Sequence, residues 1–408
     1  MNICILTKIM PSHAKGGVQD HVQMLASGLA RGGHTVSIIT TARSDNNDQS
    51  ASHQSDRTTI HYVPLTHPGK LDNAWWREST RMVQALHTQT KFDILHSEGI
   101  AGYAVIRNDI HRSLKIPAVI SFHGTHYDEL MTRWRRGFSW NPWTSLKNIA
   151  ASIIVVWKIL MWDFRTIFHA DGIVATSNEQ SDLLKSFYHI PPDRIFSVWN
   201  GMDLSAFSPA EPSPDLLRKL DIREGTPTIL CMARLIRDKG IQHMIAAMPA
   251  ILRAVPNCKL IIVGDGNYRT SLERLSKSKG MTSHIVFTGM SDFGQLPDYF
   301  RLCSVFVNPT VQQNGYDLTM VEAMACERVV ISSNIGSTPT LIEDSVDGIL
   351  FPTANVQILA DRVIQLLQNP DRRKEIGKRA RQKVMSNFTL DQMVHKTMAM
   401  YRTLIENS

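Results

Sequence analysis

A chain of 408 residues is too long for one ordinary domain, and about one domain per ~150 residues predicts two or three. Hydrophobic residues make up 43% and charged residues 20%, which is ordinary for a soluble globular protein. The net charge of +7 suits an anionic partner, but no RNA-recognition, zinc-finger or leucine-zipper pattern accompanies it. We therefore interpret the charge as a mildly basic surface and expect no nucleic-acid partner.

The cysteines indicate a reducing compartment. Cys4, Cys231, Cys258, Cys303 and Cys326 are scattered, mostly inside apolar runs, and no two of them form a CxxC pair. This distribution predicts buried thiols rather than disulfides or a zinc site. The chain also begins with MNICILT, which lacks the basic region and long apolar stretch of a signal peptide. We expect a cytoplasmic protein.

The first part of the chain alternates strand and helix patterns. NICILT is an apolar strand, the loop after it is rich in glycine, the following helix ends at Gly32 and Gly33, and HTVSIIT is a second strand. The same alternation continues through FDILHSEG (92–99), PAVISFHGTH (117–126) and DGIVATSNEQSDLLKSF (171–187). Short apolar strands separated by helices predict a parallel sheet covered on both faces.

A proline-rich connection at residues 195–214 separates this series from a second one. The second series contains strand patterns at 228–235, 259–266, 284–290, 304–310 and 329–333, with helices near 241–253 and 270–279 and another around Glu322. The sequence therefore predicts an α/β fold of two Rossmann-like, doubly wound domains, residues 1–198 and 199–388, and a final helix at 389–408. Such sheets bind ligands at the carboxyl ends of their strands, so we expect a site in a cleft between the domains.

One segment, residues 131–168, breaks the regularity. It holds five of the eight tryptophans and six basic residues but a single acid, Asp163, and its uncharged run of about ten residues is half the ~20 that span a membrane. Apolar residues recur in it at helical spacing. Two interpretations stay open: a buried helix of the first domain, or a basic, tryptophan-rich patch that rests on an anionic membrane surface.

Three glycine-containing loops are suited to phosphate. KGGVQ (15–19) lies between the first strand and the first helix, where free N–H groups of the helix N-terminus are available. ARLIRDKG (233–240) supplies two cations, Arg234 and Lys239, after the first strand of the second domain. NGYDLT (314–319) is the third loop. His123, in SFHGTH, follows a predicted strand at the edge where ligands bind, and alone such a histidine is more often structural.

Other cofactor patterns are missing from the sequence. VGDGNYR (263–269) resembles a dinucleotide fingerprint but lacks the third glycine and does not open the first strand–helix unit, so we reject a nicotinamide site. There is no GxxxxGK[ST] motif, no Asp-x-Asp and no His/Cys cluster at ligand spacing. We expect no cofactor and no metal.

The order of these motifs resembles that of a known family. The series GGVQ, SFHGTH, VATSNEQ, VWNGMD, ARLIRDKG, VGDG and NGYDLTMVEAMAC is similar to the retaining glycosyltransferases of family 4, which have the GT-B fold of two Rossmann-like domains. The resemblance runs in register over nearly the whole chain. It implies sugar transfer from a nucleotide-sugar that lies in the cleft and is bound mostly by the second domain, with the final helix crossing back to the first.

The resemblance also implies roles for individual residues. Arg234 and Lys239 would hold the diphosphate, and Glu322 would bind the ribose hydroxyls. Gly16 and Gly17 of the first domain would close over the diphosphate. The other implied catalytic or donor-binding positions are His123, facing the transferred sugar, together with Gly264, Asn314, Gly315, Tyr316, Asp317 and Leu318.

The chain departs from the family pattern at three places. Asn314 replaces the first acid of the usual Glu-x7-Glu motif, Glu327 replaces a usual glycine, and the usual GGxPE appears as GSTPT (336–340). An amide at Asn314 keeps hydrogen bonding and loses the charge, so we expect either a donor that differs from that of well-matched members or a donor sugar that is held in another way.

The sequence thus predicts a retaining hexosyltransferase. It would move a sugar from a UDP- or GDP-linked donor to a glycan or lipid-linked acceptor in cell-surface polysaccharide assembly, at the inner face of a membrane. Since departure of the diphosphate places negative charge on the leaving group, cations are the groups that this reaction needs most. Two alternatives stay open: a nucleotide-sugar epimerase of the same fold, and a noncatalytic member that binds nucleotide-sugar.

Overall fold

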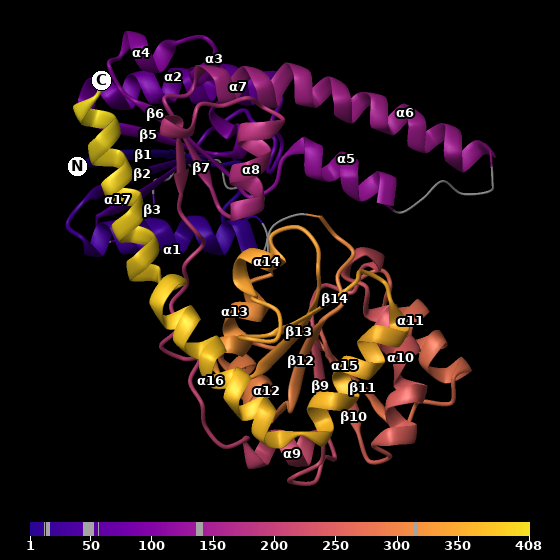
Figure 1. Ribbon diagram of the computed structural model, residues 1–408. Coiled ribbons are helices and arrows are strands. Elements are labelled where there is room, and N and C mark those ends of the chain that lie inside the picture. The colour runs from indigo at the N-terminus through magenta and orange to yellow at the C-terminus, as the bar shows by residue number, and fades with distance from the viewer. Residues whose placement is uncertain (12, 14–16, 44–52, 56, 136–141, 314–316) are drawn as a thin grey trace. The chain divides into compact units, whose positions relative to one another are not determined.

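The computed structural model describes all residues except 12, 14–16, 44–52, 56, 136–141 and 314–316 (Figure 1). The chain divides into two compact units, each with its own sheet. Unit 1 comprises Met1–Met202 and Leu390–Ser408, and unit 2 comprises Asp203–Thr389. The last helix therefore belongs to unit 1, although in the sequence the whole of unit 2 lies between it and the rest of unit 1.

Unit 1 contains a sheet of eight described strands in the order β3-β4-β2-β1-β5-β6-β7-β8. All neighbours are parallel except β3 and β4. The strands are β1 (Asn2–Leu6), β2 (Thr35–Thr40), β3 (His53–Ser55), β4 (Thr58–Tyr62), β5 (Ile94–Glu98), β6 (Ala118–Phe122), β7 (Gly172–Ala175) and β8 (Ile195–Ser197).

Helices cover both faces of this sheet because its strands are apolar on both sides. In β1, Ile3 and Ile5 pack on one face, against α1 and α17, whereas Cys4 and Leu6 pack on the other, against α2 and α3. The helical segments of unit 1 are α1 (Gly17–Arg31), α2 (Asn73–Gln89), η1 (Gly99–Gly102), α3 (Tyr103–Arg107), α4 (Ile110–Ser113), α5 (His126–Arg135), α6 (Pro142–Lys158), the π-helical η2 (Ile159–Asp163), α7 (Phe164–His169), α8 (Asn178–Ser186), η3 (Pro192–Arg194) and α17 (Leu390–Glu406).

Unit 2 contains a parallel sheet of six described strands in the order β11-β10-β9-β12-β13-β14. The strands are β9 (Thr228–Met232), β10 (Lys259–Val263), β11 (Ile285–Gly289), β12 (Val305–Asn308), β13 (Val329–Ser333) and β14 (Ile349–Phe351). The helical segments are α9 (Pro214–Lys219), η4 (Arg237–Lys239), α10 (Ile241–Ala254), α11 (Arg269–Ser278), η5 (Phe293–Gln295), α12 (Leu296–Leu302), α13 (Leu318–Ala325), α14 (Thr338–Leu341), α15 (Val356–Gln368) and α16 (Pro370–Asn387).

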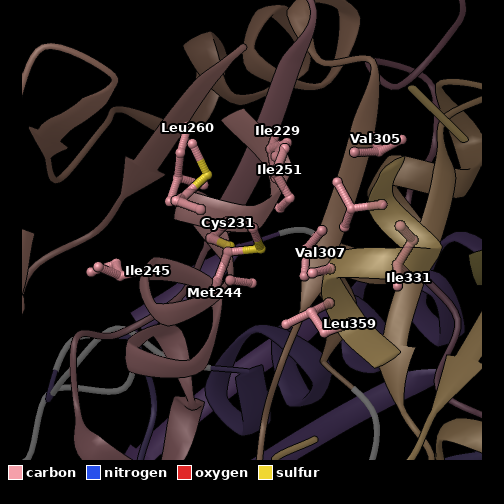
Figure 2. Packing of buried hydrophobic residues seen from close by; sticks show 14 of the residues in the cluster. Ile229, Cys231, Met244, Ile245, Ile251, Leu260, Val305, Val307, Ile331 and Leu359 are labelled. Carbon is pink, nitrogen blue, oxygen red and sulfur yellow. The ribbon is translucent and has the colours of Figure 1, made fainter. Parts of the chain in front are cut away.

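Figure 2 shows the core on one face of this second sheet. Ile229 and Cys231 of β9 point to the same side as Val307 of β12, and they pack against Met244 of α10 and Leu359 of α15. The expectation of two Rossmann-like α/β domains is confirmed. The final helix packs against α1 of unit 1, as expected, whereas α15 packs against α10 within unit 2.

The structure also shows the state of the cysteines and the character of the helices. All five cysteines are buried and free, and burial raises the pKa of each thiol, that of Cys326 to about 11, so these thiols stay protonated at neutral pH. None of the helices in the described residues has the length and apolar character that a membrane span requires.

Candidate functional site

The order of the strands defines a ligand-binding edge in each unit. In unit 2 the chain runs from β9 outward through β10 to β11 and then returns to place β12 on the other side of β9. In unit 1 the same reversal occurs between β1 and β5. Ligands of doubly wound sheets bind at the carboxyl ends of the strands beside such a switch point.

In unit 2, the loops after β9 and β12 are fastened to each other. Val311 N donates to the carbonyl oxygen of Asp238 at 2.8 Å, and Thr310 Oγ1 donates to the same oxygen at 3.2 Å. Lys239, the last residue of η4, forms an ion pair with Asp317, the residue that precedes α13. A cation from one side of the switch point thus meets a carboxylate from the other.

The Lys239–Asp317 pair is partly shielded from water. The side chain of Lys239 is 12% exposed and that of Asp317 is 26% exposed. Asn308, at the end of β12, donates from Nδ2 to the other oxygen of Asp317 at 3.1 Å. Arg234, in contrast, is exposed on the same loop as Lys239. The edge therefore holds one cation that is already paired within the chain and one that faces solvent.

Two glycines allow these loops to approach each other. Gly240 has φ +70°, and a Cβ atom there would lie 1.8 Å from the carbonyl oxygen of Pro309, after β12. Gly264, after β10, has φ +129°, and its Cβ would lie 2.0 Å from the carbonyl oxygen of Ala233. Since glycine has no Cβ atom, the backbones of three neighbouring loops can come together at this edge, and no other residue fits either position.

Helix α13 begins at this edge and carries Glu322 in its second turn. Glu322 is 5% exposed, and Leu318 is the first residue of the helix. The helix buries Met320, Val321 and Met324 completely, which fixes its position against the sheet. The remaining residues implied for this loop, Asn314, Gly315 and Tyr316, lie outside the described residues, as does Gly16 of unit 1; Gly17 is the first residue of α1.

In unit 1, the switch-point edge holds a buried carboxylate and histidines. Glu98 ends β5, and its Oε2 accepts a hydrogen bond of 2.7 Å from Nε2 of His123, which follows β6. Nε2 of His21, on α1, lies 3.8 Å from Glu98 Oε1, and Nε2 of His96 lies 3.7 Å from it. The His21 and His123 rings are 4.4 Å apart between centroids.

Charge and burial act in opposite directions on these groups. Burial raises the pKa of Glu98, but the charge and hydrogen bond of His123, with the charges of His21 and His96, outweigh it and lower that pKa to about 2. Burial, with the neighbouring His123, lowers the pKa of His21 to about 3. At neutral pH the carboxylate is therefore ionised and His21 is neutral.

The cluster continues to the final helix. His96 shares one hydrogen bond with the hydroxyl of Tyr401 on α17 and a second, of 2.7 Å, with Ser121 Oγ. In the described part of the chain, His21, Glu98 and His123 also place one ligand atom each within 4.8 Å of one another, a set that geometry alone would allow to bind a metal ion. The 2.7 Å hydrogen bond joins His123 to Oε2 of Glu98, whereas Oε1 of Glu98 is buried without a hydrogen-bond partner among the described residues.

Sequence reasoning found His123 and missed its neighbours Glu98, His21 and His96. Glu98 carried a usable signal, since it ends a predicted strand one position before a glycine, as His123 stands before Gly124. His21 and His96 carried none, because a histidine on a helix and a histidine within a strand are ordinary core residues. Asn308, at the end of β12, was also missed.

The tryptophan-rich segment forms helices α5, α6, η2 and α7. Helix α5 packs against α6, and the two extend from the sheet as a hairpin (Figure 1). Only part of α6 is core: Val155 is 2% exposed, whereas Ile153 is 65% exposed. Among the described residues of α5, α6 and η2, the large apolar side chains that are 40% exposed or more are those of Trp134, Ile149, Ile153, Ile154, Val156, Trp157 and Leu160.

The open face of the hairpin contains an apolar groove. The groove has a volume of about 480 Å³ and is lined by Trp134, Ile149, Ser152, Ile153 and Val156. The base of the hairpin is anchored in the core, where Asp163 accepts hydrogen bonds from His126 and Tyr188. Helix α6 is therefore partly exposed rather than buried throughout, while Ile167 of α7 is buried, and contact of the exposed face with an anionic membrane stays a prediction.

Comparisons with known proteins identify the class and then the family. The structure of a sucrose-phosphate synthase from Thermosynechococcus elongatus matches with a TM-score of 0.81 and 21% identity, and it covers 100% of both chains, which shows the GT-B fold. The family model described as Glycosyltransferase Family 4 matches residues 15–206, and that described as Glycosyl transferases group 1 matches residues 213–383. The chain belongs to the group 1, family 4 glycosyltransferases.

Two relatives complete this comparison. An uncharacterized glycosyltransferase from Methanocaldococcus jannaschii is 26% identical over 100% of this chain and 99% of its own. A GDP-mannose-dependent alpha-(1-6)-phosphatidylinositol monomannoside mannosyltransferase from Mycobacterium tuberculosis is 30% identical over 52% of this chain and 54% of its own. The protein is an enzyme of a retaining family, and it transfers a sugar from a nucleotide-sugar.

Proposed function

We propose that the protein is a retaining hexosyltransferase that uses a UDP- or GDP-linked donor and a glycan or lipid-linked acceptor in cell-surface polysaccharide assembly. The observation that carries the donor half is the arrangement at the switch point of unit 2. There Lys239 and Arg234 follow β9, and Asp317 and Glu322 follow β12. The polysaccharide pathway itself rests on the family resemblance.

We assign Lys239 to the diphosphate because its ammonium group lies at this edge and already pairs with an anionic group. In the described structure the carboxylate of Asp317 occupies the position beside its Nζ. A diphosphate carries more negative charge than a carboxylate, so it would compete for the same cation. Arg234, exposed on the same loop, would add a second donor to the leaving group as its charge develops.

The glycines and Glu322 are assigned to the rest of the donor. Gly240 and Gly264 let the loops after β9 and β10 lie directly against the carbonyl oxygens of Pro309 and Ala233, which brings the donor-binding loops of this edge together. Glu322, held on a buried helix, would accept hydrogen bonds from ribose hydroxyls. Asn314, Gly315, Tyr316 and Leu318 would line the sugar and phosphates from the same loop, as the resemblance implies.

His123 is assigned to the transferred sugar, and Gly16 and Gly17 to the diphosphate on the side of unit 1. Since Glu98 accepts the Nε2 hydrogen of His123, the imidazole is held in one orientation. In a retaining mechanism of this family the departing phosphate helps to deprotonate the acceptor hydroxyl. No enzyme nucleophile is then required, and the cations that stabilise the leaving diphosphate contribute the main catalytic effect.

The acceptor half is carried by the α5–α6 hairpin. Its exposed apolar residues, Trp134 and Trp157 among them, form a surface of the kind that enters the headgroup region of a bilayer. The sequence of residues 131–168 adds six basic residues, and its one acid, Asp163, is buried. This charge complements an anionic membrane. The name of the Mycobacterium tuberculosis relative, which acts on a phosphatidylinositol monomannoside, agrees with a lipid-linked acceptor at the inner membrane surface.

A panel of UDP- and GDP-hexoses tests the donor assignment. Release of nucleoside diphosphate in the presence of a membrane lipid extract measures transfer, and the rise in unfolding temperature with each donor measures binding. We expect Lys239→Met and Arg234→Met to lower turnover on the order of a hundredfold. The control Arg253→Met removes the same charge near the carboxyl end of α10, where the side chain is exposed.

The outcomes separate the competing functions. Full activity of both Lys239→Met and Arg234→Met would remove the donor site from this edge. Donor consumption without acceptor, giving an isomerised nucleotide-sugar, would favour the epimerase. Tight donor binding without turnover on any lipid or glycan extract would favour a noncatalytic binding protein.

A further inference from the structure

A second cavity lies in unit 2 at the edge opposite the switch-point site. It has a volume of about 730 Å³. Its walls come from the segment before β9, the residues that lead into β12 and β13, and the start of α16. Ser304 and Arg328, for example, directly precede β12 and β13. The cavity is therefore at the amino ends of the strands, and none of the residues proposed to bind the donor lines it.

The cavity is lined by more cations than anions. The basic lining residues are Arg223, Arg301, Arg328, Arg373 and Lys374. Three carboxylates, those of Glu211, Glu224 and Glu327, also line it. Within the described residues, none of these three is in an ion pair with any of the five cations. Arg301 pairs instead with Asp298, outside the lining, at 3.2 Å, and the other four cations have no ion pair among the described residues. Positive charge thus exceeds negative charge around a space large enough for a small molecule.

Two of these arginines have structural partners. Arg301 donates to the carbonyl oxygens of Ser208 at 3.0 Å and Ala206 at 3.1 Å. Arg373 donates to the carbonyl oxygens that end α15, those of Leu366 at 2.6 Å and Leu367 at 2.8 Å. Both side chains hold backbone segments in place and so build the wall of the cavity.

Arg328 differs from them. Among the described residues its side chain has no hydrogen bond or ion pair, and its Nε is buried without a partner. A buried donor without an acceptor costs on the order of 1–3 kcal/mol, so nearly all such groups in folded proteins have one. Arg328 and Arg373 both line the cavity, and burial together with the charge of Arg328 lowers the pKa of Arg373.

The position of Arg328 is fixed by its surroundings. The preceding residue, Glu327, has φ +59°, a left-handed conformation that costs a non-glycine residue energy. Helix α16 packs directly on this turn, since a Cβ at Gly377 would lie 2.1 Å from the carbonyl oxygen of Glu327. Arg381 of the same helix donates to the carbonyl oxygen of Ala325. The turn thus fixes the backbone from which the side chain of Arg328 lines the cavity.

We infer that this cavity is a second ligand site, which binds a small phosphorylated metabolite with its phosphate on Arg328. A doubly charged phosphate accepts two parallel hydrogen bonds from a guanidinium and offsets the repulsion between Arg328 and Arg373. The volume exceeds what a bare phosphate ion fills, and Glu211, Glu224 and Glu327 provide acceptors for the hydroxyl groups of an attached sugar or polyol.

Binding to the intact chain tests the inference. The probes are inorganic phosphate and glucose 6-phosphate, with unphosphorylated glucose as the neutral comparison and sodium chloride to keep the ionic strength constant. We expect glucose 6-phosphate to raise the unfolding temperature saturably, and calorimetry to give a dissociation constant at least about tenfold weaker for Arg328→Met. Arg274→Met, on the exposed face of α11, removes the same charge outside the cavity and should bind like wild type.

Two comparisons keep the test independent of the donor site and of misfolding. Lys239→Met should bind the probes as wild type does, and loss of binding in that variant with retention in Arg328→Met would overturn the inference. Without ligand, Arg328→Met should unfold at the same temperature as wild type or higher, because it removes an unbonded buried donor. A lower unfolding temperature together with unchanged probe binding would show that Arg328 is a structural residue. A response to inorganic phosphate equal to that for glucose 6-phosphate would mean that the site takes the free ion.

Discussion

The exposed face of the α5–α6 hairpin gives a quantitative prediction for membrane binding. Replacing Ile153, Ile154 and Trp157 together by serine removes three side chains that are 65%, 57% and 53% exposed. Complete burial of a large apolar side chain is worth about 1.5–3 kcal/mol, so burial of roughly half of each contributes about 1 kcal/mol. The three together account for about 3 kcal/mol, which is on the order of a hundredfold in the membrane partition coefficient.

Flotation with vesicles measures this coefficient. We expect the wild-type chain to float with phosphatidylcholine vesicles that contain phosphatidylglycerol, and less with phosphatidylcholine alone, because the basic residues of 131–168 favour an anionic surface. Leu65→Ser with Met290→Ser is the control, since both residues are exposed and lie outside the hairpin. The reasoning is refuted if the triple variant floats like wild type, or if wild type stays at the bottom with both kinds of vesicle.

Four further predictions concern the two switch-point edges. The pKa of His21 is lowered from 6.5 to about 3, so below pH 6.5 His21 binds a proton in the unfolded chain but not in the folded chain. The free energy of unfolding should therefore fall by about 2 kcal/mol between pH 6.5 and 5. Urea melts of His21→Leu should lack that part of the decrease. Glu98, whose pKa is lowered to about 2, stabilises the fold at neutral pH and loses this effect only as the pH falls from about 4.5 toward 2. Glu98→Gln should lower turnover by about tenfold or more while donor binding, measured by thermal shift, stays unchanged; equal losses of both would argue for simple misfolding. Gly240→Ala should lower the free energy of unfolding by several kcal/mol, and Gly280→Ala by only about 1–2 kcal/mol. Both glycines have positive φ, but only Gly240 faces a carbonyl oxygen. Equal urea midpoints for the two variants would contradict this prediction.

The fold was predictable because its signals are local. Apolar runs such as ICIL in β1 and LIIV in β10 specify buried parallel strands, and the helices between them carry apolar faces of regular spacing. The cation pair Arg234 and Lys239 was predictable for the same reason, since both follow one strand. Local pattern also places α6 as a helix, but it does not say whether its apolar face finds a partner, and only the structure shows Ile153 exposed.

The parts of the site that escaped prediction depend on contacts between distant segments. Glu98 and His21, the missed neighbours of His123, lie on different elements from it, and only the strand order of the sheet brings the three residues together. The same holds for the second cavity, whose Arg301, Arg328 and Arg373 follow no spacing that a single helix or strand would produce. Charge and burial at such places are set by the tertiary fold, and a single sequence carries no local signal for them.

The membership of α17 in unit 1 has a consequence for the order in which the protein folds. Because Asp203–Thr389 is inserted between two parts of unit 1, all of unit 2 leaves the ribosome before the segment that completes unit 1. Until α17 is made, one face of the first sheet lacks Tyr401 and Leu404, and His96 lacks its hydroxyl partner. The second unit in the sequence is therefore the first that can finish folding during synthesis, and the first unit must wait with apolar surface exposed.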